Sequence, residues 1–331
     1  MTARPAGDPA ALAERLLGGA RRYRRRDVSA GVGVSLRSAR KLWRALGFAN
    51  VGDHEIAFTE ADALALRRVV DLVRQGTIDE DTAISCARAL GQSTDRLVSW
   101  QLEALADLHL GRPDVGAATL ALVDVLADDL ERLLVYSWRR QLAAAVGRLA
   151  ELDAAGSPGS QSLTVGFADL VSYSRLSQRL GHRELGLLVQ RFEGVSADVI
   201  TAGGGRVIKT IGDEVLFVAA DPLAAAVIAL SLSERMAVDD LVPDVRVGLV
   251  HGPVLLSLGD VYGPTVNLAS RLTGMAQPGT VITDPQTGEL LAGCRDLLLV
   301  PQRSRQVRGF GPLEPLQITR SGAASPSITI D

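Results

Sequence analysis

A short segment rich in glycine, serine and proline divides this chain into two halves with different hydrophobic patterns. Residues 156–160 read Gly-Ser-Pro-Gly-Ser, and such a run is typical of a linker because it suits neither a helix nor a strand. Before it, apolar residues recur with the period of helices, whereas after it short β-rich runs alternate with helical stretches. The pattern predicts an all-α domain over residues 1–150, a linker over 151–161, an α+β domain over 162–320 and a flexible tail over 321–331.

Each half is expected to contain several regular elements. In the first half, helices are predicted over residues 9–24, 36–46, 59–75, 79–90, 94–110 and 114–152. In the second half, strands are predicted over residues 163–168, 206–210, 214–219, 245–251, 280–283, 297–301 and 313–319, and helices over 182–202, 222–237, 265–276 and 285–291. Thr59 opens a Thr-Glu-Ala-Asp capping box, which indicates a helix start.

Composition excludes several classes of protein. The chain has 331 residues, of which 47% are hydrophobic, and this argues against a disordered polypeptide. The first 20 residues lack the apolar core of a secretory signal, and no apolar run reaches the ~18 residues of a membrane span. Cys86 and Cys294 lie far apart and make neither a zinc pattern nor a disulfide framework. We therefore expect a cytoplasmic protein without a transmembrane segment.

Charge is distributed unevenly along the chain. The net charge is −3, yet residues 1–50 hold eleven Lys and Arg against three Asp and Glu. A basic block on an otherwise acidic protein can bind nucleic acid, anionic lipid or an acidic surface of its own second domain. A solvated Arg-rich helix face is an equally good interpretation of the same block.

Two aspartates in the second half are placed to meet at one cleft. Asp169 follows the apolar run at residues 163–168, so it faces water or a cation at the end of a strand. Asp213 lies in an Ile-Gly-Asp turn between two apolar runs, which reads as a hairpin. Two carboxylates at one cleft suit Mg²⁺ or Mn²⁺, which bind oxygen ligands and the phosphates of a nucleotide.

A third segment offers groups that bind phosphate. Residues 259–272 read Gly-Asp-Val-Tyr-Gly-Pro-Thr-Val-Asn-Leu-Ala-Ser-Arg-Leu, in which Gly263-Pro264 makes a turn and a helix follows. Asn267 and Arg271 are four residues apart, so they share one face of that helix. An amide and a guanidinium on one face can contact the same phosphate.

Together the three segments resemble the catalytic domain of class III nucleotidyl cyclases, in that family's order and at its approximate spacing. The resemblance covers about residues 162–319 and implies a ferredoxin-like α+β fold with an antiparallel-rich sheet and packed helices. One segment departs from the family, because residues 170–174 read Leu-Val-Ser-Tyr-Ser where the family often has Gly-Phe-Thr. That region packs around the metals through backbone groups, so we expect activity to survive the difference.

The resemblance implies a role for each matching residue. Asp169 and Asp213 match the aspartates that bind two Mg²⁺ or Mn²⁺ ions. Asn267 matches the residue that orients the nucleotide, and Arg271 the one that stabilises the transition state. Arg308, in a Val-Arg-Gly-Phe run, matches a basic residue that contacts the terminal phosphates.

Lys209 and Asp260 match the residues with which the family reads the purine. Adenine presents an acceptor at N1 and a donor amine at C6, which a lysine and an aspartate complement. Guanine has a donor at N1 and an acceptor at O6, so it would leave the lysine and the aspartate unpaired. Sites built on such hydrogen bonds reject the wrong partner by up to ~10⁴–10⁵-fold. The resemblance therefore implies an adenylate cyclase that makes cyclic AMP and pyrophosphate from ATP. Since the family builds its site from two catalytic domains, it also implies a homodimer that is nearly inactive as a monomer.

The first half carries no comparable catalytic pattern. Residues 28–48 resemble a helix-turn-helix whose second helix is basic, through Arg37, Arg40, Lys41 and Arg44. The whole layout also resembles bacterial adenylyl cyclases in which a helical N-terminal domain inhibits the catalytic domain, some responding to pH and some binding fatty acids. The long helix over residues 114–152 is then the expected transmitter.

Within that transmitter region, four residues could make the switch proton-sensitive: His109, Asp128, Asp129 and Glu131. A second class of function is a DNA-binding regulator whose cyclase-like domain only senses nucleotide. We consider nucleic-acid binding unlikely, because that alternative predicts loss of the catalytic residues, which are all present. A guanylyl cyclase is disfavoured by Lys209 and Asp260, and a diguanylate cyclase by the lack of a Gly-Gly-Asp/Glu-Glu-Phe run.

Overall fold

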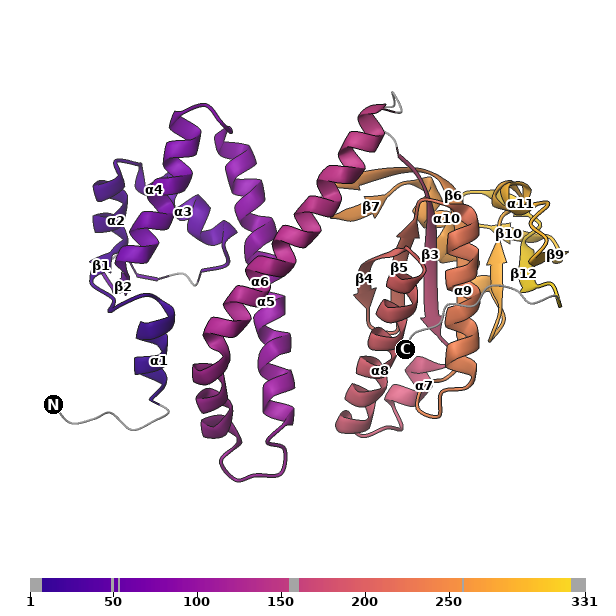
Figure 1. Cartoon of the computed structure of the whole chain (residues 1–331), viewed down its shortest axis with the longest axis horizontal. Helices are drawn as coiled ribbons and strands as arrows, with labels where there is room; N and C mark the ends of the chain where they lie inside the picture. The colour runs from indigo at the N-terminus through magenta and orange to yellow at the C-terminus, as the bar shows by residue number, and fades with distance from the viewer. Residues whose placement is uncertain (1–7, 49–50, 53, 155–160, 258, 323–331) are drawn as a thin grey trace. The chain divides into compact units, whose positions relative to one another are not determined.

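A computed structural model describes residues 8–48, 51–52, 54–154, 161–257 and 259–322. The contacts divide the chain into two compact units, Met1–Leu149 and Ala150–Asp331. Residues 155–160 and 323–331, most of the predicted linker (151–161) and tail (321–331), lie outside the described residues, whereas residues 151–154 are helical and Gln161 begins a strand. Each unit is described by itself (Figure 1).

The N-terminal unit is helical, as the sequence predicts. Its elements are α1 (Pro9–Leu16), β1 (Tyr23–Arg24), α2 (Arg25–Val32), α3 (Leu36–Ala45), β2 (Ile56–Phe58), α4 (Glu60–Arg74), α5 (Glu80–Asp107) and α6 (Val115–Ala154). Its core is formed by helices α2, α3, α4 and α5 and includes Val28, Leu42 and Leu66. The ring centres of Trp43 and Phe58 lie 4.5 Å apart. The Thr59 capping box at the start of α4 is confirmed.

Two predictions for this unit are wrong. The helix expected over residues 9–24 ends at Leu16, because Gly18 and Gly19 adopt positive φ angles of 71° and 145°. The two helices expected over residues 79–90 and 94–110 are one helix, α5. Gly91 lies inside it because α3 and α5 pack closely there: a Cβ at Gly91 would lie 2.6 Å from the backbone of Leu46.

The C-terminal unit contains the α+β sheet that the sequence predicts. Its strands are β3 (Gln161–Leu170), β4 (Arg206–Ile211), β5 (Glu214–Ala219), β6 (Val245–Ser257), β7 (Asp260–Tyr262), β8 (Val281–Thr283), β9 (Leu297–Pro301), β10 (Arg305–Val307), β11 (Gly311–Leu313) and β12 (Leu316–Arg320). Its helices are α7 (Tyr173–Ser177), α8 (His182–Ala202), α9 (Pro222–Ala237), α10 (Pro264–Met275) and α11 (Pro285–Leu291).

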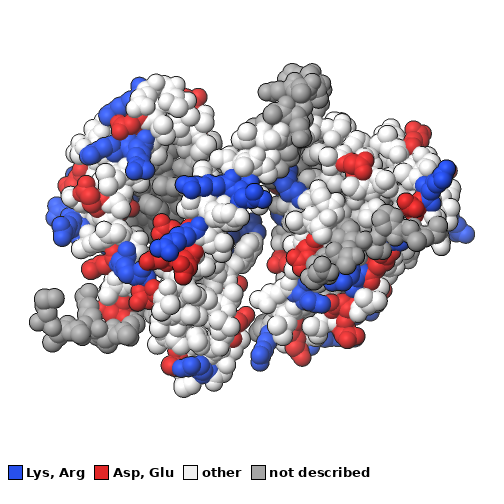
Figure 2. Space-filling model, viewed as in Figure 1, with Lys and Arg blue, Asp and Glu red and all other residues white. Residues whose placement is uncertain are grey.

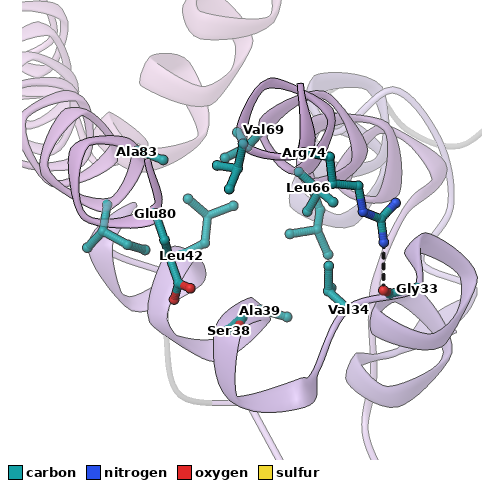
Figure 3. Close-up of a pocket in the computed structure, with 13 residues that line it drawn as sticks. Gly33, Val34, Ser38, Ala39, Leu42, Leu66, Val69, Arg74, Glu80 and Ala83 are labelled. Carbon is teal, nitrogen blue, oxygen red and sulfur yellow. Dashed lines mark hydrogen bonds between the residues drawn. The ribbon is translucent and has the colours of Figure 1, made fainter. Parts of the chain in front are cut away.

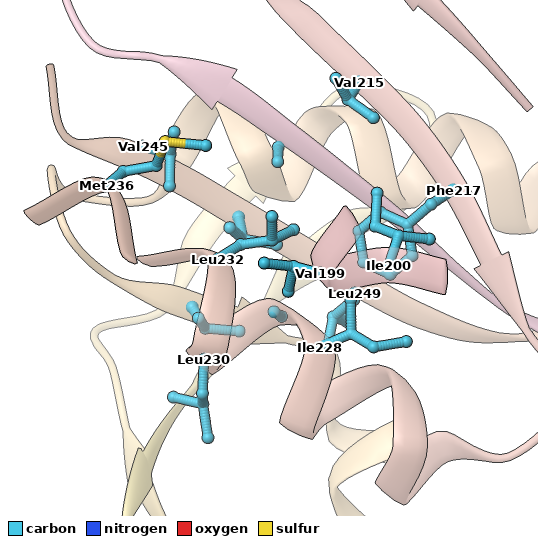
Figure 4. Packing of buried hydrophobic residues seen from close by; sticks show 14 of the residues in the cluster. Val199, Ile200, Val215, Phe217, Ile228, Leu230, Leu232, Met236, Val245 and Leu249 are labelled. Carbon is cyan, nitrogen blue, oxygen red and sulfur yellow. The ribbon is translucent and has the colours of Figure 1, made fainter. Parts of the chain in front are cut away.

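The sheet has the ferredoxin-like core that the resemblance implies. The chain runs β3-α8-β4-β5-α9-β6, and these four strands lie in the order β4-β5-β3-β6 with every neighbouring pair antiparallel. Strand β8 then joins β6 in parallel, followed by β12 and β9. Figure 4 shows the main core, where Ile228 and Leu232 of α9 and Ile200 of α8 meet Phe217 of β5.

The opposite face of the sheet carries a second core with different cover. Leu163, Val165 and Phe167 of β3 pack there with Leu216 of β5 and with α10. The contact is close, since a Cβ at Gly248 of β6 would lie 2.4 Å from the Thr273 backbone nitrogen of α10. Helix α10 therefore covers the face of the sheet toward which Leu163, Val165 and Phe167 point, whereas α8 and α9 cover the other face.

Candidate active site

Three carboxylates meet where β3, β5 and the β4–β5 turn come together. Asp169 of β3 lies opposite Glu214 of β5 in the strand register. Asp213 follows Gly212, whose φ of 65° makes the turn, and its carbonyl oxygen accepts a hydrogen bond of 3.0 Å from the Leu170 N–H. The structure thus brings the two predicted metal aspartates together at one end of the sheet.

These acids change one another's proton affinity. Burial raises the pKa of Asp169, and the neighbouring Asp213 carboxylate adds to that rise while Arg246 opposes it. Burial together with the charges of Asp169 and Asp213 raises the pKa of Glu214 to about 7. Three carboxyl groups thus share one arginine, Arg246, which is an environment that favours a cation.

Arg246 of β6 is a site residue that sequence reasoning missed. Its Nε donates to Asp169 Oδ2 at 2.7 Å, because β3 and β6 pair with Asp169 opposite Arg246. Glu214 was missed as well, although it directly follows the Gly-Asp turn. Adjacency in the sequence could have indicated Glu214, whereas the strand register that places Arg246 is visible only in the fold.

The donor set fits a hard divalent cation. No group of three or more His, Cys, Asp or Glu side chains suited to hold a metal alone occurs among the residues that the structure describes. Asp169 and Asp213 instead supply two neighbouring carboxylates, and Mg²⁺ in nucleotide sites typically takes one or two carboxylates, with water and phosphate oxygens completing the shell. Asp169 and Asp213 are thus the residues that would hold Mg²⁺ or Mn²⁺.

The segment that departs from the family pattern turns sharply beside these acids. Ser172 has a φ of 62°, in the left-handed region that non-glycine residues rarely adopt. The Val171 N–H donates to the carbonyl of Asp244 at 2.9 Å, which ties the segment to the loop before β6. The segment after Asp169 is therefore held by this backbone bond together with Leu170, which is buried in the main core, and Tyr173, which packs against that core.

Lys209 of β4 and Asp260 of β7 form an ion pair. The Lys209 ammonium donates to the Asp260 carboxylate, with 34% and 20% of the two side chains exposed. Burial alone would raise the pKa of Asp260, but hydrogen bonds from Lys209 and from the Val261 N–H lower it below its usual value. The structure brings the two predicted purine-reading residues together, Lys209 from β4 and Asp260 from β7, a strand that was not predicted.

Helix α10 presents Asn267 and Arg271 on the side away from the sheet. Its other side buries Leu268 and Leu272 in the second core, so that Asn267 is exposed and Arg271 only partly covered. The Arg271 guanidinium lies 5.8 Å from the centre of the Phe310 ring, within the range of a cation–π contact.

Arg308 lies in the turn that carries Phe310. The turn joins β10 to β11, with Val307 buried at its base and Arg308 exposed. Because Phe310 contacts Arg271, this turn adjoins α10 and places a second arginine on the same side of the domain.

These groups share one face of the sheet. Asp169 continues the alternation of Leu163, Val165 and Phe167 toward the second core, and Lys209 lies opposite Leu216 of that core. Two large apolar side chains on this face are exposed, Ile211 at 53% and Leu256 at 43%, whereas Leu255 and Tyr262 alternate with core residues and lie on the other side of the β6–β7 pair. The face thus combines charged groups with uncovered apolar surface.

Comparison with known proteins identifies the family. The model of the adenylate and guanylate cyclase catalytic domain matches residues 157–319. An adenylate cyclase of Glutamicibacter nicotianae is 48% identical over 95% of this chain and 83% of that protein. The chain belongs to the class III nucleotidyl cyclases. The predicted family and enzyme class are confirmed.

Two further similar proteins extend the comparison. A protein of Mycobacterium tuberculosis named "pH-sensitive adenylate cyclase" is 31% identical and covers 86% of this chain and 75% of its own length. The crystal structure of an adenylyl cyclase from P. aeruginosa aligns with a TM-score of 0.45 at 22% identity, over 49% of this cyclase and 95% of that chain. Within the described part of this cyclase, no helix has the length and apolar character needed to cross a bilayer.

Proposed function

We propose that this cyclase converts ATP into 3′,5′-cyclic AMP and pyrophosphate at sites shared by the two subunits of a homodimer. The observation that carries the choice of ATP is the ion pair of Lys209 with Asp260. An ammonium and a carboxylate held side by side present one donor and one acceptor, which match N1 and the C6 amine of adenine. The names of the relatives, adenylate cyclases in Glutamicibacter nicotianae and in Streptomyces coelicolor, support the same substrate.

The proposed reaction is an in-line displacement at phosphorus. The ribose 3′-hydroxyl gives up its proton to water and its oxygen forms a bond to the α-phosphorus, while the bond from that phosphorus to the bridging oxygen breaks and pyrophosphate leaves with the electron pair. Mg²⁺ or Mn²⁺ held by Asp169 and Asp213 would lower the pKa of the 3′-hydroxyl and neutralise phosphate charge. Asn267 orients the nucleotide, Arg271 donates to the oxygens that gain charge on the α-phosphorus, and Arg308 holds the terminal phosphates.

The shared site is supported by apolar side chains that stay exposed beside the part of the sheet that α10 covers. This side of the domain carries both halves of the chemistry, the metal aspartates and the purine-reading pair, with exposed Ile211 and Leu256 beside them. A monomer leaves this apolar surface in water, whereas a twofold pairing covers it and brings the aspartates of one copy to Arg271 of the other. We therefore propose that one protomer gives the metal site and its partner gives the base and phosphate contacts.

The experiment that tests the substrate measures product from each nucleotide. We expect the full chain with Mg²⁺ or Mn²⁺ to make cyclic AMP from ATP and at least ~10³-fold less cyclic GMP from GTP, because guanine leaves Lys209 and Asp260 unpaired. The readout is kcat/KM for the two nucleotides, with chromatography of both products. Equal use of ATP and GTP would contradict the proposed reading of the base.

The N-terminal unit is proposed to regulate this activity. A cavity of about 290 Å³ between α3, α4 and α5 has apolar walls that include Leu42, Leu66 and Val69 (Figure 3). Its arginine, Arg74, already donates to the Gly33 carbonyl at 2.8 Å. An apolar small molecule such as a fatty-acid chain fits these walls, and Ala83 lies at the boundary with a second apolar cavity.

A proton signal is the second proposed input. Of the residues predicted to sense it, Asp128 pairs with Arg15 of α1 at 2.9 Å and Asp129 with Arg132 at 3.6 Å, and these pairs are largely exposed. The described surface of this unit intersperses Asp and Glu among its Lys and Arg on the face in Figure 2, and Lys41 of the basic helix pairs with Glu80 at 3.1 Å. Such mixed charge favours contact of the basic helix with acidic groups of the protein itself over binding to nucleic acid.

The regulatory proposal predicts different pH profiles for two proteins. We expect residues 156–331 alone to make cyclic AMP several-fold faster than the full chain between about pH 5.5 and 8, and with a flatter profile, because the N-terminal inhibition is absent. The measurement is cyclic AMP formation at saturating Mn²⁺-ATP across that range. Parallel profiles at equal rates would rule out inhibition by the N-terminal unit, and an inactive fragment would indicate that this unit activates.

A further inference from the structure

Helix α6 changes its surroundings halfway along its length. Over residues 115–130 the half-buried positions recur at steps of three and four, so one side of the helix packs within the N-terminal unit. Arg15 of α1 pairs there with Asp124 and with Asp128, each at 2.9 Å. Over residues 131–144 every residue is exposed. The rest of the described N-terminal unit therefore leaves the second half of α6 uncovered.

This bare half is apolar rather than polar. Val135, Trp138 and Leu142 are 40%, 59% and 47% exposed, and Leu133 and Tyr136 are about as exposed on other sides of the helix. Helices that stand in water alone carry charged and polar residues all round. So much apolar surface on one short segment indicates that something covers it in the functional protein.

The spacing of the apolar residues specifies what can cover them. Val135, Trp138, Leu142 and Ala145 follow one another at steps of three, four and three residues, which is the spacing of the seam between two helices of a coiled coil. We propose that residues 135–145 pair in parallel with the same segment of a second copy of this chain. This proposal rests on the homodimer of the proposed function and adds a second contact to it.

The residues around the seam agree with parallel pairing of identical helices. In that arrangement Leu134 of one helix flanks Arg139 of the other, and Gln141 flanks Val146, so no like charges meet. The two seam positions that precede Val135 are Asp128 and Glu131, whose charges would repel across a twofold axis. The pairing therefore begins only after the part of α6 that α1 occupies.

Pairing of this segment would link the two halves of the enzyme. Along the chain, α6 is the last element before β3, which carries Asp169. A twofold contact in α6 and a shared site between catalytic domains impose the same symmetry on the dimer. A signal that shifts the α6 pairing would then change how the two catalytic domains meet.

The test uses cross-linking of the full chain through single cysteines. Cys86 and Cys294 are first replaced by serine, and activity is checked. Leu142→Cys then places a thiol in the proposed seam, whereas Arg140→Cys, the matched control, places one on the outer side of the same exposed helix. With a short bis-maleimide reagent, we expect covalent dimer from Leu142→Cys at least ~10-fold faster than from Arg140→Cys, because only seam residues lie within reach of their counterparts.

A second measurement separates this proposal from the catalytic dimer itself. Restored activity on mixing Asp213→Ala with Arg271→Ala chains reports the shared active site. If mixing restores activity but neither thiol cross-links, or both cross-link at equal rates, the α6 pairing is wrong while the homodimer stands. If mixing fails and only Leu142→Cys cross-links, the α6 pairing stands and the shared site is wrong.

Discussion

Replacing Asp213 by alanine is expected to lower cyclic AMP formation by roughly 10³-fold or more. Asp213 supplies one of the two carboxylates of the proposed metal site, and removing a group that stabilises charge in the transition state typically costs at least ~10²–10³ in rate. The side chain is partly exposed at a turn, and the bond that holds this turn to Leu170 uses the Asp213 carbonyl rather than its carboxylate. We therefore expect the fold to survive, which circular dichroism and thermal unfolding would verify beside kcat with Mn²⁺-ATP.

A matched control replaces an acid elsewhere on the same unit. Asp240 is exposed in the loop after α9, and Asp240→Ala removes the same charge from the domain. We expect its activity to stay within about twofold of the parent, since solvent and salt screen the charge of an exposed side chain. Comparable losses in both variants would mean that net charge, not the metal site, explains the effect.

Mixing two inactive variants gives the stronger form of this experiment. In a heterodimer of Asp213→Ala and Arg271→Ala chains, one site combines both lesions while the other is intact. If subunits exchange at random, half of the dimers are mixed and carry one working site, so activity recovers to about a quarter of the parent value. No recovery after verified exchange would show that the aspartates and Arg271 act within one chain.

The fold and the site differ in how far a sequence can predict them. Helices α8 and α9 begin and end where the hydrophobic period and caps predict, because the sheet covers one side of each. The break predicted between residues 90 and 94 is wrong, since the closeness of α3 makes glycine necessary inside a continuous helix at Gly91. The local sequence pattern predicts an element correctly where the element's own residues determine its structure. It fails where packing against an element distant in sequence determines it, as at Gly91.

The same distinction applies to the candidate site. Asp169, Asp213, Asn267 and Arg271 stand in local motifs, and those motifs carry the resemblance to the cyclases. Arg246 reaches Asp169 only through the pairing of β3 with β6, which no motif encodes. The contact of Lys209 with Asp260 likewise depends on β7, a strand of three residues that is too short to give a hydrophobic pattern.

Exchanging the hydrogen-bonding character of Lys209 and Asp260 is expected to convert the nucleotide preference. In the double variant Lys209→Glu, Asp260→Asn, the first side chain becomes an acceptor for guanine N1–H and the second gains a donor for O6. Adenine then meets the mismatch that guanine meets in the parent. Because such buried mismatches cost up to ~10⁴–10⁵ in kcat/KM, we expect the ratio of ATP to GTP use to fall by at least ~10³-fold.

The single variants decide whether the conversion arises from base reading. Lys209→Glu alone places two carboxylates where the parent has an ion pair, so their repulsion should lower activity with both nucleotides. Asp260→Asn alone keeps the lysine but can turn either end of its amide to the base, so it should weaken discrimination without reversing it. A double variant that loses ATP activity without gaining GTP activity would leave Lys209 and Asp260 with a structural role only. A reversal in the double variant that exceeds the combined effects of the singles would show that the pair acts as one reader, as expected for two side chains in direct contact.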